Sequence, residues 1–407
     1  MRVYRAAWIL PIAAPPIRDG WVAVEQGVVA DLGTGTQPGA IDLGDAVVLP
    51  ALVNAHTHLE LSHLRGVVPP ADRFLDWIRG VMAARGTQPD AHAPAVLAAA
   101  RVAISAARAS GTGVMGDISN TLATVPLLEE AGMPARVFYE LLGFNVDDPV
   151  DRVGRARTEA DRAQRHATGI RISLAPHAPY SVSPALFRAI REDLDAHAAD
   201  RSSVHLAESP DEVEFIEHGT GGWPELLRAV GAWADAWRPA GRSPVRYLSD
   251  LGFLDSRVLA VHGVQCSGDD LTVLKALGTT VVSCPRSNRY VGVGDPPIES
   301  FYAVGVPVAL GTDSLASVED LNMFAELAAA RRLAPRVPAR DLLESATLRG
   351  ARALGFGAQF GSIEAGKRAA LIAVRVPGRV DDVEEYLLSG IEPAVVAWLD
   401  PDNPKSQ

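Results

Sequence analysis

Cysteine and long apolar runs are scarce in this chain of 407 residues. Its two cysteines, Cys266 and Cys284, are too few for a disulfide framework, which is typical of a protein from a reducing, cytoplasmic compartment. No stretch approaches the ~20 consecutive apolar residues that a membrane helix needs. Pro11 interrupts the apolar opening MRVYRAAWIL, and a strand-like segment follows at once, so we expect no export signal. The sequence predicts a soluble cytoplasmic protein without a membrane partner.

Positive charge is in deficit as well. Lysine and arginine total 38 residues against 49 acidic ones, which gives a formal net charge of −11. A surface of that sign does not attract a polyanion, so we expect no nucleic-acid partner. Apolar side chains, by contrast, make up 48% of the chain, enough for one barrel-sized domain and a smaller one. The oligomeric state stays open, a homo-oligomer included.

Apolar runs alternate with alanine-rich helical segments from residue 48 onward, which is typical of a parallel sheet. Eight such runs with intervening helices, spread over about 270 residues, match a (β/α)8 TIM barrel. The runs are 48–55, 112–119, 135–144, 170–179, 202–209, 258–264, 279–288 and 306–314. The longest insertion, 210–257, is expected to form helices over the mouth of the barrel.

Both ends of the chain have a different texture, with short strand-like runs broken by glycine and proline. We expect residues 1–47 and 358–407 to form one small β-sandwich domain and residues 48–357 to form the barrel. The predicted fold class is therefore α/β, a TIM barrel with a small β-sandwich domain built from both chain ends.

Several ionisable side chains stand at the carboxyl ends of the predicted strands. His56 and His58, in the segment NAHTHLELS, are two residues apart and so face the same side of a strand. His205, His262 and Asp313 lie at the ends of the fifth, sixth and eighth runs, and in a closed barrel these ends meet around one mouth. Three histidines and an aspartate suit one divalent transition metal, and Zn²⁺, Fe²⁺ and Mn²⁺ are all acceptable.

Groups for proton transfer stand beside these candidate ligands. Glu208, three residues past His205 in HLAES, can move a proton between water and a leaving group. The alternative is a carboxylate favoured at a helix start by the helix dipole. Asp313 can both contact a metal and accept a proton, and His262 can hold the nucleophile or a developing negative charge. The sequence predicts Glu208, His262 and Asp313 as catalytic residues.

The segments NAHTHLELS, HLAES, VHGV, CPRSN and GTDS, in this order, resemble the motif set of the amidohydrolase superfamily, in its deaminase and chlorohydrolase branch. The resemblance covers almost the whole chain, and it implies that Glu208 and His262 are catalytic. Binuclear members carry a carboxylated lysine at the fourth strand, whereas this chain has no lysine between Arg171 and Arg188, so we expect one metal ion. The ligands that the resemblance implies are His56, His58, His205 and Asp313.

The segment PHAPYSVS resembles deaminases of 5′-substituted nucleosides, in which the histidine matching His177 hydrogen-bonds the ribose or the base. With FLDWIRGVM and CPRSNRY, the resemblance is closest to the 6-aminodeoxyfutalosine deaminases of menaquinone biosynthesis, whose substrate carries a benzoate on its ribose side. A guanidinium suits that carboxylate, and Arg286 or Arg289 is the candidate. Trp77 can stack on the substrate or be buried in an amphipathic helix. Asn288 can orient a neighbouring ligand or loop.

Hydrolytic deamination of the adenine ring is the reaction that these features predict. A metal-activated hydroxide attacks C6 while Glu208 moves a proton to N1, and ammonia leaves. Alternatives on the same site are deamination of S-adenosylhomocysteine, methylthioadenosine or guanine, and dechlorination of a triazine. The alternative from another class is a metal-binding scaffold without catalysis, and the joint presence of Glu208, His262 and Asp313 argues against it.

Overall fold

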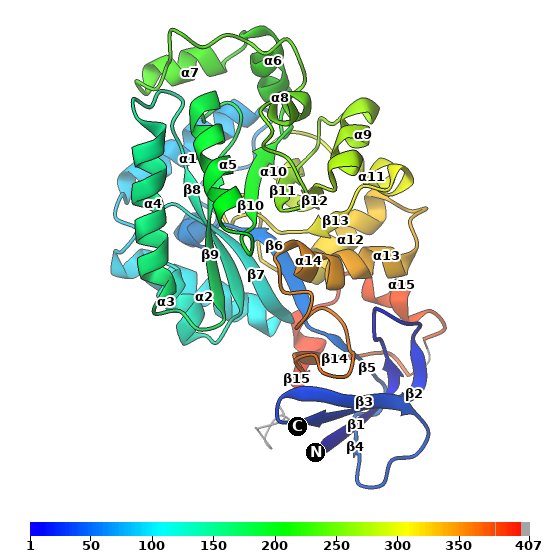
Figure 1. Cartoon of the computed structure of the whole chain (residues 1–407). Helices are drawn as coiled ribbons and strands as arrows, with labels where there is room; N and C mark the ends of the chain where they lie inside the picture. Colours follow the sequence, from blue (N-terminus) through cyan, green and yellow to red (C-terminus); the bar gives the residue numbers. More distant parts are fainter. Residues whose placement is uncertain (379, 400–407) are drawn as a thin grey trace.

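Two parts of different architecture are visible in the computed structural model, which describes residues 1–378 and 380–399. Figure 1 shows a large part in which helices surround strands, and beneath it a smaller sheet that contains the first strands of the chain. None of the helices within the described residues is both long and apolar enough to cross a bilayer. Both cysteines, Cys266 and Cys284, are free, and the cellular compartment stays a prediction.

Eight strands in two parallel sheets of four form the framework of the large part. Neighbours pair in parallel throughout, as the alternation of strands and helices in the sequence predicts. Nearly every residue of these strands is buried, as expected for sheets that helices cover. The first sheet contains β6 (Leu52–Thr57), β7 (Thr112–Ser119), β8 (Ala135–Leu141) and β9 (Ile170–Pro176), and the second contains β10 (Ser202–Leu206), β11 (Val258–His262), β12 (Thr280–Ser283) and β13 (Val308–Leu310).

Helices follow the strands, and several begin with proline at the first helical position, where no backbone N–H is needed. In α5 the hydroxyl of Ser183, just before Pro184, accepts a hydrogen bond from the backbone N–H of Leu186 and so caps the helix. The helices that follow the strands of the first sheet are η1 (Leu59–Leu64), α1 (Phe74–Thr87), α2 (Pro94–Ala109), α3 (Val125–Glu130), α4 (Pro149–Gln164) and α5 (Pro184–Ala196). Those that follow are α9 (Gly268–Leu277), α10 (Pro285–Tyr290), α11 (Ile298–Val304), α12 (Met323–Leu333), α13 (Ala339–Ser345), α14 (Leu348–Ala353), α15 (Val383–Leu387) and η2 (Pro393–Val395).

The insertion at 210–257 forms helices beside the carboxyl ends of the strands, as predicted. It contains α6 (Pro210–His218), α7 (Trp223–Ala229) and α8 (Pro244–Asp250). Figure 1 places α6 and α7 at the top of the large part, at the end toward which β8 and β10 point.

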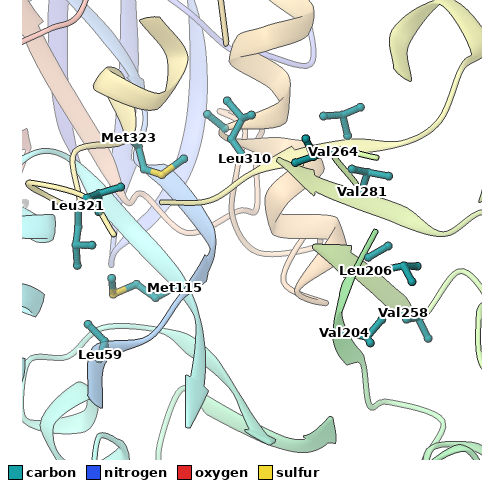
Figure 2. Packing of buried hydrophobic residues seen from close by; sticks show 14 of the residues in the cluster. Leu59, Met115, Val204, Leu206, Val258, Val264, Val281, Leu310, Leu321 and Met323 are labelled. Atoms are coloured by element: carbon teal, nitrogen blue, oxygen red, sulfur yellow. The ribbon is translucent and has the colours of Figure 1, made fainter. Parts of the chain in front are cut away.

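Side chains of the parallel strands divide between two apolar clusters, because successive residues of a strand point to opposite faces. On β11, Val258 and Ala260 belong to the cluster beneath the helices, whereas Leu259 and Val261 belong to a second cluster between the sheets. Figure 2 shows part of the first cluster, with Val204 on β10 beside Val258 on β11. The second cluster draws residues from both sheets: Val53, Val114, Ile118, Phe138, Ala175, Leu259, Val261, Val282 and Ala309.

Hydrogen bonds connect the two sheets at both junctions. The backbone N–H of His205 donates to the carbonyl of His177 at 2.9 Å, and the backbone N–H groups of Thr312 and Asp313 donate to the carbonyl of His56 at 3.1 and 3.0 Å. Among the described strands, however, no ladder pairing crosses either junction. The closed eight-stranded barrel therefore stays a prediction at this level of description.

The predicted β sandwich is not shown. Strands from both chain ends do share a sheet, and β14 pairs antiparallel with β5, but within the described residues they form one seven-stranded sheet in the order β15-β14-β5-β1-β2-β3, with β4 beside β1. A sandwich requires a second sheet packed on the first. The strands are β1 (Arg2–Ile9), β2 (Ile17–Glu25), β3 (Val28–Thr34), β4 (Ile41–Asp42), β5 (Ala46–Pro50), β14 (Leu371–Arg375) and β15 (Val396–Leu399).

Of the eight predicted runs, only 112–119 has the same bounds as a strand of the structure, and two of the others show why bounds differ. The run 48–55 is divided at Ala51, because the backbone up to Pro50 pairs with β14 and the backbone from Leu52 onward pairs with β7. A continuous apolar run carries no sign of such a change of partner. The run 279–288 ends as a strand at Ser283, after which α10 begins at Pro285.

Candidate metal and catalytic site

Three histidines meet where β6 and β10 end. His56 is the penultimate residue of β6, His58 precedes η1, and His205 is the penultimate residue of β10. Nitrogen atoms of the three rings lie within 4.8 Å of one another, and the Nε2 atoms of His58 and His205 are 3.3 Å apart. The structure thus brings together residues that are up to 149 positions apart, as the strand-end argument predicts.

Asp313 completes this cluster from the loop after β13. Its Oδ1 lies 3.5 Å from Nε2 of His58 and 3.8 Å from Nε2 of His56. Its Oδ2 accepts a hydrogen bond from the hydroxyl of Ser287 at 2.6 Å, and its Oδ1 accepts one from the backbone N–H of Ser314 at 2.7 Å. The carboxylate is therefore held in a fixed orientation toward the imidazoles.

The donor set fits a divalent metal ion. His56 is fully buried, yet neither of its ring nitrogens has a hydrogen-bond partner in the part of the chain that the structure describes. Buried polar atoms without partners are rare and call for an explanation such as an ion. Burial lowers the pKa of His58 and of His205 to about 3 and that of His56 well below its usual value. The neutral imidazole, the form that binds a metal, is thus favoured at neutral pH.

Contacts around the cluster orient its members. Nδ1 of His205 lies 3.0 Å from the carbonyl oxygen of His177, so it donates its proton there and leaves Nε2 facing the cluster. A carboxylate of Asp117 accepts hydrogen bonds from the backbone N–H of Leu59 and the hydroxyl of Thr124 at 2.9 and 2.6 Å. This contact fixes the backbone immediately after His58.

Glu208 lies beside the cluster in the turn between β10 and α6 and is only 4% exposed. Burial, with Asp313 and Glu212 as nearby negative charges, raises the pKa of the Glu208 carboxyl well above its ordinary value. Glu212 holds the turn in place, because its carboxylate accepts the backbone N–H groups of Ala207 and Glu208, both at 2.9 Å. Glu208 itself precedes the N-cap residue Ser209, so its carboxylate does not cap α6.

His262 ends β11 with its ring 3.6 Å, Nε2 to Oε1, from Glu208. Nδ1 of His262 lies 2.8 Å from the side-chain oxygen of Asn288, so this nitrogen donates and Nε2 keeps its lone pair toward the site. Burial lowers the pKa of His262. Asn288 is fully buried on α10, and its contact orients His262.

Backbone strain accompanies these positions. Ala207, His262 and Asp313 all have positive φ angles, of 51°, 75° and 63°, in the left-handed region that residues other than glycine rarely adopt. Strain of this kind clusters at functional sites, where the surrounding structure enforces it. Here Ala207 follows β10 directly, His262 is the last residue of β11, and Asp313 lies in the loop after β13.

A cavity of about 410 Å³ opens above the cluster. His58, His205, Glu208, His262 and Asp313 line it at one end, and α1 and the insertion supply much of the rest of the wall. Its apolar lining consists of Leu61, Phe74, Trp77, Ile78, Val81, Met82, Leu142, Phe144, Tyr180, Trp223, Leu226, Leu227, Val230 and Ala232.

Among the predicted substrate-binding residues, only His177 and Trp77 line this cavity. Trp77 is 8% exposed, so it is both buried in α1 and part of the cavity wall. Arg286 instead pairs with Asp320 at 2.9 Å, and Arg289 pairs with Asp295 at 3.3 Å. Both arginines border a separate surface hollow, because α10 turns them away from the site.

Sequence reasoning missed three residues of the site. Glu140 lines the cavity with Oε1 3.6 Å from Nδ1 of His205, and the available signal was a carboxylate within the apolar third predicted strand, 135–144. Arg85 lines the cavity eight residues after Trp77, a spacing that puts both on one face of a helix. Glu212 follows Ser209 by three residues, the spacing of a capping box.

The fold and this cluster define an α/β protein with a potential metal-binding group at the ends of its parallel strands. The chain belongs to the amidohydrolase family, whose model matches residues 47–406. It is 35% identical over 319 residues to the aminodeoxyfutalosine deaminase of Deinococcus radiodurans, covering 76% of this chain and 74% of the relative. It is 31% identical over 392 residues to the 5-methylthioadenosine/S-adenosylhomocysteine deaminase of Moorella thermoacetica, covering 90% and 83%.

A solved structure agrees over nearly the full length. The crystal structure of an adenosine deaminase from Xanthomonas campestris with bound zinc aligns with a TM-score of 0.82 and 27% identity, covering 97% of this chain and 90% of that chain.

Proposed function

We propose that this chain is a metal-dependent aminohydrolase that removes ammonia from the adenine ring of a 5′-modified nucleoside. Membership of the amidohydrolase family and the deaminase relatives support hydrolytic deamination. One observation carries the proposal further: Asp313 and three histidines meet beside Glu208 and His262 at the end of a largely apolar cavity. Such a cavity admits a planar base and presents it to the polar groups.

The two parallel sheets are, in this proposal, halves of one closed (β/α)8 barrel formed by residues 48–357, with residues 1–47 and the described part of 358–407 as a separate β domain. Residues 379 and 400–407 of that predicted range lie outside the described residues. The hydrogen bonds at both junctions and the apolar cluster shared between the sheets support closure. Closure brings the ends of the first, fifth, sixth and eighth strands together, which is where barrels of this kind carry their sites.

The residues that would hold the ion are His56, His58, His205 and Asp313, with Zn²⁺, Fe²⁺ and Mn²⁺ as acceptable metals. When bound, the metal would supply a nucleophile at neutral pH, because such an ion lowers the pKa of water to about 7. A single ion is favoured. A second group of potential ligands, Glu140, His177 and His205, shares a histidine with the first, and Nδ1 of His177 already bonds the hydroxyl of Ser181 at 2.6 Å.

Glu208 transfers the proton in this proposal. Its pKa is raised and that of His262 is lowered, and both directions favour a protonated carboxyl beside a neutral imidazole. A protonated carboxyl is the form that can donate to N1 of the adenine. His262, held by Asn288, then presents a neutral Nε2 to the nucleophile, and Asp313 accepts a proton on the opposite side.

The finer proposal for the substrate is 6-aminodeoxyfutalosine, since the Deinococcus radiodurans relative bears that activity in its name. The Moorella thermoacetica relative favours a second candidate, methylthioadenosine or S-adenosylhomocysteine. We infer that Glu140, beside His177 in the cavity wall, accepts hydrogen bonds from ribose hydroxyls in either case.

The experiment incubates the zinc-loaded chain with 6-aminodeoxyfutalosine, methylthioadenosine, S-adenosylhomocysteine, guanine and a chlorinated triazine, and follows the release of ammonia or chloride. We expect ammonia from the adenine nucleosides, with the highest kcat/KM for 6-aminodeoxyfutalosine. A higher kcat/KM for methylthioadenosine would make methylthioadenosine the substrate, and the proposed deamination reaction would stand. No turnover of any nucleoside would leave a metal-binding scaffold or a dechlorinating enzyme and overturn the proposal.

A further inference from the structure

The charge of the cavity wall is uneven. Among the described residues that line the cavity, Arg85 is the only lysine or arginine. It stands in the last turn of α1 (Phe74–Thr87) and is exposed, so it lies at the open side of the cavity. The metal cluster lies at the buried side, since His56 and His205 are 0% and 6% exposed. A ligand that fills the cavity therefore has one end at the histidines and the other within reach of a guanidinium.

A polar strip joins these two ends along one wall. Oε1 of Glu140 lies 3.6 Å from Nδ1 of His205, and Oε2 of Glu140 accepts a hydrogen bond from the side-chain nitrogen of Asn120 at 2.9 Å. The side-chain oxygen of Asn120 in turn lies 3.5 and 3.4 Å from Nη1 and Nη2 of Arg85. Arg85 is thus oriented by Asn120 through long contacts that leave most of its five N–H donors available.

Arg85 also differs from the other described arginines near the site in its ionic contacts. No carboxylate in residues 1–378 and 380–399 forms an ion pair with it within 4.0 Å, whereas Arg79 on the same helix pairs with Asp76 at 2.9 Å. Arg286 and Arg289, which follow β12, are likewise paired. A guanidinium beside a largely apolar wall, with unused donors, favours a bidentate anion such as a carboxylate.

We propose that Arg85 binds a carboxylate carried on the 5′ side of the nucleoside and so selects acidic 5′-substituents over neutral ones. The apolar side chains of α1 and α7 around it, among them Trp77, Met82 and Leu226, accommodate an aromatic or aliphatic spacer between ribose and carboxylate. This inference rests on the proposed deaminase function and assigns the charge of its substrate.

The test compares Arg85→Gln and Arg85→Lys with a matched control, Arg79→Gln, which removes an exposed arginine from the same helix. Two nucleosides are used: 6-aminodeoxyfutalosine, which carries a benzoate, and 5′-deoxyadenosine, which carries no charge. Loss of a charge-assisted pair predicts a KM for the benzoate-bearing nucleoside that is about 10- to 100-fold higher in Arg85→Gln, with kcat within about twofold. Arg85→Lys retains the charge and loses the bidentate geometry, so we expect its KM to lie between those of the wild type and Arg85→Gln.

Kinetics with 5′-deoxyadenosine separate recognition from structure. We expect its kcat/KM to stay within about twofold of the wild-type value in both Arg85 variants, and Arg79→Gln to match the wild type on both substrates. Metal content measured on every variant checks that the histidine cluster is intact. An equal loss on both nucleosides, or no change on the acidic one, overturns the assignment of Arg85. Absence of turnover in the wild-type chain with both nucleosides would instead refute the deaminase function.

Discussion

Replacing Glu208 by Gln tests the proton-transfer assignment most sharply. The carboxyl is 4% exposed and lies 3.6 Å from Nε2 of His262, so glutamine fits the same space and keeps one oxygen there. Glu208 is not part of the histidine cluster that would hold the metal. The variant should therefore fold and retain metal while losing the group that exchanges a proton with the substrate.

The expected loss follows from what a positioned acid or base contributes. General acid–base catalysis supplies about 10²- to 10⁴-fold in rate, which corresponds to about 3 to 5 kcal/mol in the barrier. We expect the loss in kcat, with KM within about threefold, because glutamine preserves the shape of the cavity. The raised pKa of Glu208 favours the protonated carboxyl, which is the form that donates a proton.

The assay measures ammonia release under single turnover and metal content by mass spectrometry on the same samples. Glu225→Gln, on the exposed face of α7, is the matched control and should behave as the wild type. A Glu208→Gln chain that retains both metal and normal turnover would refute the assignment. A chain that loses its metal would show that Glu208 acts on the cluster itself.

Three further changes probe the support of the site. Gly311→Ala places a Cβ 2.8 Å from the Cβ and backbone nitrogen of His56. We therefore expect weaker metal binding and, in a denaturation assay, a loss of about 1–3 kcal/mol in unfolding free energy. Gly154→Ala is the control, because its helix leaves open space for the new Cβ, and it should leave stability unchanged or increase it. Asn288→Ala removes the acceptor that orients His262, and we expect kcat to fall about 10- to 100-fold with KM nearly unchanged; equal kcat would contradict the positioning role. The buried histidines of the cluster have folded-state pKa values below the unfolded value, so the unfolded chain takes up more protons and the metal-free protein should lose stability as pH falls from about 6.5 towards 4. Thermal unfolding across that range checks this, and an unchanged melting temperature would refute it.

The sequence predicted the residues that topology gathers. A parallel strand ends at the same edge as its neighbours, so an ionisable residue at each end, such as His205 or Asp313, can be assigned to one site without knowing any distance. The helical insertion over this edge was predicted because residues 210–257 form the longest insertion between two predicted strands.

Contacts that depend on the direction of a side chain could not be read in this way. Arg286 and Arg289 follow the seventh predicted strand, yet α10 begins at Pro285 and carries them toward Asp320 and Asp295. Arg85 reaches the cavity from a helix, where only its spacing from Trp77 hinted at a shared face. The sandwich prediction was not confirmed for a different reason: strand texture indicates β structure but not how many sheets the strands form.

Metal stoichiometry tests the central claim most directly. Elemental analysis of the purified chain should find about one divalent transition metal ion per molecule, and a His58→Asn, His205→Asn double variant should bind almost none while its far-UV circular dichroism matches the wild type. A wild-type chain that releases ammonia from an adenine nucleoside without any transition metal, or a double variant that still binds one ion per chain, would contradict the account.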